Sequence, residues 1–100
     1  MEIDSSVENK AVTARRWLVD AVIELKESLH DPEGDTIIRD LIRKKGWYVV
    51  DGLRTAKLLR FKVWADSGEE AEEIVSRICS ELRLYNPVSH ICRVKCGGPA

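Results

Sequence analysis

The sequence has no surplus of charge of either sign, and this absence argues against two classes of partner. It contains 16 basic and 17 acidic residues, so the formal net charge is −1. A dedicated nucleic-acid binder usually carries a basic stripe, and an anionic membrane surface attracts basic segments. No apolar run approaches the roughly 20 residues that span a bilayer. The first residues, Met-Glu-Ile-Asp-Ser-Ser, also lack the basic start and apolar core of a signal peptide. We therefore expect a cytoplasmic protein that binds neither nucleic acid nor membrane.

Cysteine and histidine are scarce and badly spaced for chemistry. The three cysteines, Cys79, Cys92 and Cys96, form no CxxC pair, and an odd number does not suggest a disulfide framework. Cys92 and Cys96 lie on one predicted strand, where four residues of rise separate them by about 13 Å. That distance is too long for a shared metal or a disulfide. His30 and His90 have no further ligand at metal spacing. With no phosphate-binding glycine loop either, the sequence predicts no catalytic residue, no metal site and no cofactor bound by this chain.

What the sequence does contain is a clear succession of hydrophobic periods. Alternation of apolar and polar residues predicts strands over residues 17–26, 58–65 and 88–95, and a short β-rich run predicts another over 47–52. Helical spacing predicts one helix over 32–45 and a second between Ser67 and the Asn86-Pro87 pair. This order is the βαββαβ, or ferredoxin-like, pattern. We therefore predict an α+β sandwich with a four-stranded antiparallel sheet and both helices on one face.

Boundary residues support the same plan. Asp31 suits an N-cap, Pro32 the first helical position and Gly46 the C′ position, while Ser67 and Glu70 form a capping box. The domain is predicted over 16–96. Residues 1–15 are predicted to be a flexible extension, and residues 97–100 a frayed tail.

The sheet face opposite the helices is predicted to mix charges with Leu18, Val22, Leu58 and Trp64. So much apolar surface on an open face favours self-association, with Trp64 as an interface anchor. Arg54 and Lys57 lie in a predicted loop between strands. On sequence alone they are either partner contacts or a solvated loop.

Three runs of residues carry a family resemblance. They are Leu-Lys-Glu-Ser-Leu-His-Asp-Pro-Glu-Gly at 25–34, Asp-Gly-Leu-Arg-Thr-Ala-Lys at 51–57, and Cys-Ser-Glu-Leu at 79–82 followed by Asn-Pro-Val at 86–88. In this order they resemble the PurS family, the small subunit of phosphoribosylformylglycinamidine synthase. The similarity marks Asp31, Pro32, Gly34, Asn86 and Pro87 as structural motif positions. Our candidate partner contacts are Arg54, Lys57 and Trp64.

The resemblance implies a ferredoxin-like subunit that forms a homo-oligomer, a dimer or tetramer. It also implies a bridge between a large synthetase subunit and a glutaminase subunit, helping ammonia to pass between them during de novo purine (IMP) biosynthesis. In that complex the partner subunits use ATP, Mg and glutamine, and the small subunit has no catalytic residues of its own.

Ala56 departs from the family, which usually has glycine there. If that glycine serves a positive φ, Ala56 adds strain. Two other hypotheses stay open. The chain is either a free-standing dimeric ferredoxin-like module with a ligand-binding or regulatory role, or a small enzyme that uses Cys92 or the basic loop.

Overall fold

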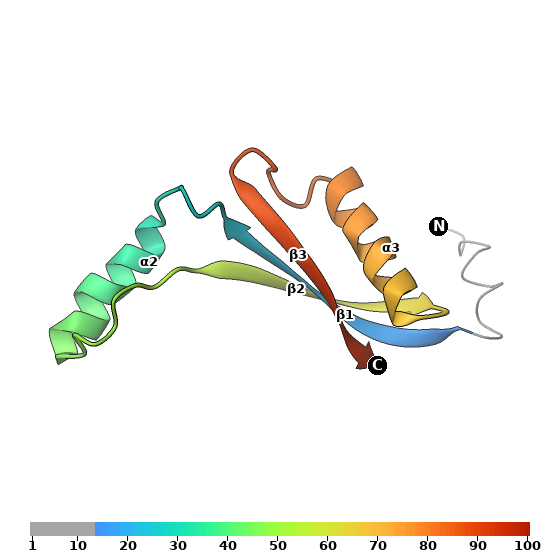
Figure 1. Ribbon diagram of the computed structural model, residues 1–100, viewed down its shortest axis with the longest axis horizontal. Helices are drawn as coiled ribbons and strands as arrows, with labels where there is room; N and C mark the ends of the chain where they lie inside the picture. The colour runs from blue at the N-terminus through green and yellow to red at the C-terminus, as the bar shows by residue number, and fades with distance from the viewer. Residues whose placement is uncertain (1–13) are drawn as a thin grey trace.

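The structure, a computed structural model, describes residues 14–100 and forms an elongated α+β domain of 56 × 27 × 23 Å (Figure 1). The predicted extension lies outside the described residues up to residue 13. The elements are β1 (Arg15–Leu25), α2 (Pro32–Ile37), η1 (Ile38–Ile42), η2 (Arg43–Lys45), β2 (Ala56–Ala65), α3 (Gly68–Glu81) and β3 (His90–Pro99).

Strand β1 is the centre of a three-stranded antiparallel sheet in the order β2-β1-β3. In its register, Val19 lies opposite Phe61 on β2 and opposite Cys96 on β3. Val19, Ala21 and Ile23 are buried, as the alternation predicted. The even-numbered residues of β1 therefore face away from the core.

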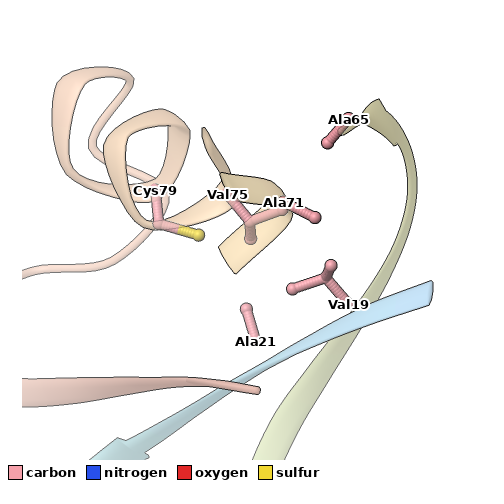
Figure 2. Packing of buried hydrophobic residues seen from close by; sticks show 6 residues of the cluster. All are labelled: Val19, Ala21, Ala65, Ala71, Val75 and Cys79. Carbon is pink, nitrogen blue, oxygen red and sulfur yellow. The ribbon is translucent and has the colours of Figure 1, made fainter. Parts of the chain in front are cut away.

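Helix α3 packs across all three strands on this buried face, and small side chains fill the space between them. Figure 2 shows the central cluster of Val19, Ala21, Ala65, Ala71, Val75 and Cys79. The apolar side chains of α3 are only partly in the core. Ile74 is half-buried against the cluster, whereas Leu82, beyond the last turn, is 68% exposed.

The prediction of a fourth strand over residues 47–52 is wrong. The segment forms turns and coil, and Trp47, Tyr48 and Val49 are 63%, 74% and 85% exposed. The cause is the direction of the preceding helix. The run from Pro32 to Lys45 is helical throughout, as predicted, and ends at Gly46 with a φ of +91°. It projects away from the sheet, and α2 packs against none of the three described strands, β1, β2 and β3 (Figure 1). Residues 47–52 therefore begin far from the edge of β2, and the described residues form neither a four-stranded sheet nor a layer of two helices.

The prediction of a frayed tail over residues 97–100 is also wrong, because β3 continues to Pro99, which lies opposite Trp17. An irregularity between Leu18 and Val19 lets the pairing resume beyond Cys96. Within residues 14–100, no helix has the length and apolar character to cross a membrane.

We call the helical run from Pro32 to Lys45, together with residues 46–50, the arm. Its base is packed and its end is not: Ile38 is 8% exposed, whereas Leu41, one turn later, is 62% exposed.

Candidate interaction site

The N-terminus of α2 is held by one buried carboxylate. Asp31 is 5% exposed and accepts hydrogen bonds from the backbone N–H of Gly34 at 3.1 Å, the backbone N–H of Thr55 at 2.7 Å and the Thr55 hydroxyl at 2.9 Å. The Thr55 N–H contributes most, followed by the Gly34 N–H, and together they lower the pKa of Asp31 from 3.8 to about 2. The N-cap prediction is confirmed. Asp31 is therefore an anion whose acceptor oxygens are committed to structure.

The loop before β2 packs directly on the first turn of α2. A Cβ on Gly34 would lie 2.3 Å from the carbonyl oxygen of Leu53, so only glycine permits this approach. On the other side of the loop, the Arg54 guanidinium donates to the carbonyl oxygens of Lys26 at 3.1 Å and Leu29 at 2.9 Å. We call this set (Asp31, Gly34, Leu53, Arg54 and Thr55) the latch. It ties the end of β1, the start of α2 and the start of β2 together, and so fixes the direction of the arm.

A second motif shapes the turn before β3. The Asn86 side-chain oxygen accepts from the Val88 N–H at 3.0 Å, and its backbone carbonyl accepts from the N–H groups of Ser89 at 3.2 Å and His90 at 2.8 Å. Pro87 fixes the backbone between them. These bonds are local to the turn.

Lys57 lies at the edge of a pocket that the sequence did not predict. The pocket, about 580 Å³, lies at the end of the sheet's inner face that α3 leaves uncovered. Its lining combines apolar side chains with polar groups of both charges: Ile23, Glu24, Leu25, Glu33, Thr55, Ala56, Lys57, Leu84, Tyr85, Asn86 and His90. Arg54 and Lys57, taken together in the sequence, thus have different surroundings. Arg54 belongs to the latch, and Lys57 faces the pocket.

Trp64 lies on the opposite, open face of the sheet, where the alternation placed it. It is 44% exposed, and the Arg16 guanidinium carbon lies 5.7 Å from its ring centroid. Two cross-strand ion pairs share this face, Arg60 with Asp20 at 2.8 Å and Arg93 with Glu24 at 3.0 Å. The hydrogen bond from Arg60 lowers the pKa of Asp20. Apolar side chains at Leu18, Val22 and Leu58 lie between the charges, so this face presents a mixed surface with one large aromatic side chain.

The cysteines lie on or beside the core. Burial, with Cys79 as a neighbour, raises the pKa of the Cys92 thiol to about 11. Cys92 therefore stays protonated near neutral pH, which disfavours a nucleophilic role. Across residues 14–100, no group of three or more His, Cys, Asp and Glu side chains is arranged to hold a metal ion. Ala56 is a strand residue, and Arg83 is the non-glycine residue with positive φ in the described part, so the expected strain at Ala56 is absent.

These features define a small α+β protein with one uncovered sheet face. Its motif residues fix the direction of the helix and turns, and several of its large apolar side chains are exposed to solvent. A family comparison gives this class a specific identity. A model of PurS, described as phosphoribosylformylglycinamidine (FGAM) synthase, matches residues 18–97, and the chain belongs to the PurS family.

Named relatives agree. The PurS subunit of phosphoribosylformylglycinamidine synthase from Archaeoglobus fulgidus is 41% identical over 71 residues, covering 71% of this chain and 86% of the relative. The crystal structure of Methanocaldococcus jannaschii PurS, one of the subunits of formylglycinamide ribonucleotide amidotransferase in the purine biosynthetic pathway, matches with a TM-score of 0.72 and 30% identity, covering 82% of this chain and 96% of that one. A chain in the structure of PurLQS from Thermotoga maritima matches with a TM-score of 0.70 and 32% identity, covering 81% and 96%.

Proposed function

We propose that this chain is the non-catalytic small subunit of FGAM synthase, and that it bridges the large synthetase subunit and the glutaminase subunit. In this role it aids the passage of ammonia, while the partner subunits use ATP, Mg and glutamine. Membership of the PurS family and the similarity to a chain of the PurLQS structure support a place in that complex. The motif residues support a structural role, because the charged groups of Asp31 and Arg54 form hydrogen bonds with backbone groups of this chain.

The observation that carries the bridging role is the presence of two separate exposed apolar surfaces. One is the end of the arm, where Trp47, Tyr48 and Val49 are exposed. The other is the open sheet face, where Leu58 and Trp64 are 51% and 44% exposed. Exposed apolar patches mark interaction sites in soluble proteins, and two patches on different elements suit contacts with different molecules. Homo-oligomerisation to a dimer or tetramer uses such surfaces as well.

Reconstitution tests this proposal. The chain is mixed with purified synthetase and glutaminase subunits, and amidine formation is measured with glutamine and, separately, with ammonium ions as nitrogen source. We expect the three proteins to co-purify, and omission of this chain to abolish glutamine-dependent synthesis while sparing more of the ammonium-dependent rate. Turnover by the isolated chain, or full glutamine-dependent activity without it, would refute the proposal.

A single charge reversal tests the contact role of Lys57. Lys57 and Lys62 are both exposed lysines of β2, but they point to opposite faces of the sheet. We expect Lys57→Glu to weaken complex formation by about tenfold, the effect of a lost contact worth about 1.4 kcal/mol. The melting temperature should stay unchanged. Lys62→Glu probes the open sheet face, which is itself a proposed contact surface, so the unchanged melting temperature is the control for folding. Equal binding by Lys57→Glu and the parent would show that the pocket end of β2 is not a docking surface.

One observation favours a second function, that of a free-standing dimeric ligand-binding or regulatory module. The pocket beside Lys57 has the size of a small-molecule site. This function predicts that a small metabolite raises the melting temperature of the isolated chain, that Lys57→Glu removes the shift, and that the synthetase and glutaminase subunits do not bind.

A further inference from the structure

The open face of the sheet carries an excess of positive charge, although the chain as a whole does not. Within residues 14–100, the strand register places five cations and two carboxylates on this face: Arg16, Arg60, Lys62, Arg93, Lys95, Asp20 and Glu24. The face therefore has an excess of three positive charges, whereas the formal net charge of the whole chain is −1. On the other side of the sheet, α3 presents exposed acidic residues, among them Glu69, Glu73 and Glu81.

The two carboxylates do not neutralise the surface, because each is more buried than the arginine that it binds. The side chains of Asp20 and Glu24 are 30% and 28% exposed, whereas those of Arg60 and Arg93 are 60% and 72% exposed. The lysines of the face, Lys62 and Lys95, are exposed, and neither forms an ion pair with another residue of the described part. A molecule that approaches this face therefore meets positive charge.

Apolar side chains lie among these cations. Trp64 is exposed beside Arg16, Leu58 is exposed opposite Val22, and Leu18 lies opposite Lys62. Tryptophan and arginine are the residue types enriched at the centres of protein interfaces. The complementary surface would place aspartate and glutamate around an apolar pocket.

A second copy of the chain does not have that complementary surface in a closed arrangement. Two copies placed face to face bring two positive surfaces together, and like charges across an interface oppose association. The acidic side of α3 in another copy has the right sign. However, a contact between two different patches is heterologous, and it gives open-ended chains unless the rotation closes a ring. The charge pattern therefore favours a different protein as the occupant.

We propose that the open sheet face is the docking surface for one larger subunit of the synthase, and that this subunit presents an acidic surface to it. The inference rests on the proposed function and names the chemistry of one of its contacts. Lys62 and Lys95 lie on the two edge strands, on either side of β1, and pair with carboxylates of the subunit. Trp64 occupies an apolar pocket between those carboxylates.

Titration calorimetry of the full chain with each purified subunit tests the contact with matched substitutions. Lys62→Glu and Arg77→Glu change the net charge equally, but Arg77 lies on α3, on the other side of the sheet. We expect Lys62→Glu and Lys95→Glu each to raise the dissociation constant for one subunit by about tenfold, and Trp64→Ala by about tenfold or more. Arg77→Glu should leave the constant unchanged. Melting temperatures check that all variants are folded.

Salt dependence separates the charge contacts from the apolar ones. Exposed charges are screened over about 10 Å at an ionic strength of 0.1 M and over about 3 Å at 1 M. We expect the parent dissociation constant to rise between these two conditions, and that of the Lys62→Glu, Lys95→Glu double variant to change less. A parent affinity that does not depend on salt, or equal effects of Lys62→Glu and Arg77→Glu, would overturn the proposal.

Self-association of the double variant, measured by sedimentation equilibrium, identifies the occupant. Weakened subunit binding with unchanged self-association supports the proposal. Weakened self-association with normal subunit binding would show that a second copy occupies the face, and would overturn it. Binding of the double variant to both subunits as tightly as the parent rejects this inference alone, whereas a parent chain that binds neither subunit rejects the proposed function and the inference with it.

Discussion

Gly34→Ala is the sharpest test of the latch, because two effects of the substitution have opposite signs. Within a helix, alanine is favoured over glycine by about 0.8–1.0 kcal/mol. At this position, however, the new Cβ would meet the Leu53 carbonyl oxygen at 2.3 Å, the Leu53 carbonyl carbon at 3.1 Å and the Arg54 Cα at 3.3 Å. All three are backbone atoms, so no side-chain rotation relieves the contact.

The clash should exceed the gain in helix propensity. Inserting one methyl group into a packed site costs about 1–3 kcal/mol, and backbone movement here also disturbs the Thr55 N–H bond to Asp31. We therefore expect a net loss of about 1–2 kcal/mol in the free energy of unfolding. In a domain of this size each kcal/mol lowers the melting temperature by about 4–8 °C.

Thermal unfolding followed by circular dichroism measures the effect, at one fixed protein concentration because self-association also shifts the transition. Gly52→Ala is the matched control. Gly52 lies on the same loop, has no atom within 4 Å of its Cβ position and does not adopt a positive φ. The Gly52→Ala substitution should leave the free energy of unfolding unchanged or raise it by up to about 1 kcal/mol. A Gly34→Ala variant as stable as the parent would refute the close approach of Leu53 to α2.

Two further predictions concern single residues. The pKa of Asp31 falls from 3.8 to about 2 on folding, so its stabilisation is complete above the higher value and is lost as the pH falls towards the lower one. Melting temperatures measured across this interval should fall more steeply for the parent than for Asp31→Asn, and parallel profiles would contradict the assignment. Arg83 ends α3 with a φ of +51°, in a turn where Arg83 N–H donates to the Ser80 carbonyl and Leu84 N–H to the Cys79 carbonyl. Arg83→Gly should raise the free energy of unfolding by about 1 kcal/mol in urea denaturation, and a destabilised variant would contradict the strain.

Local signals in the sequence predicted what local physics decides. Asp31 and Ser67 cap their helices, with Glu70 Oε1 accepting from the Asp66 N–H beside the second cap. Gly46 ends the first helical run in the left-handed region. The alternation along β1 also separated the core face from the open face correctly. Each of these features depends on neighbours within a few residues.

Features that depend on distant residues were not predictable in the same way. The β-rich run after Gly46 has the composition of a strand, but a strand also needs an edge to pair with. Whether one is in reach depends on the direction of α2, which Thr55 sets from 24 residues away through Asp31. In the same way, pairing with Trp17 orders the glycine-rich end of the chain that composition alone described as a tail. The pocket beside Lys57 depends on the same direction, because Glu33 of α2 lines it, and so the pocket was missed as well.

The latch also explains how residues that bind backbone groups of their own chain can mark a family of subunits. Asp31, Gly34 and Arg54 come from two separate motif runs, yet all three act on one joint, the base of the arm. A domain that worked alone would gain stability by laying the arm on its own sheet, because Leu41, Trp47 and Tyr48 would then be buried. The latch instead holds these side chains in solvent, where the surface of another protein can bury them. A motif that fixes a projecting arm therefore suits a subunit of a larger enzyme better than a domain that works alone.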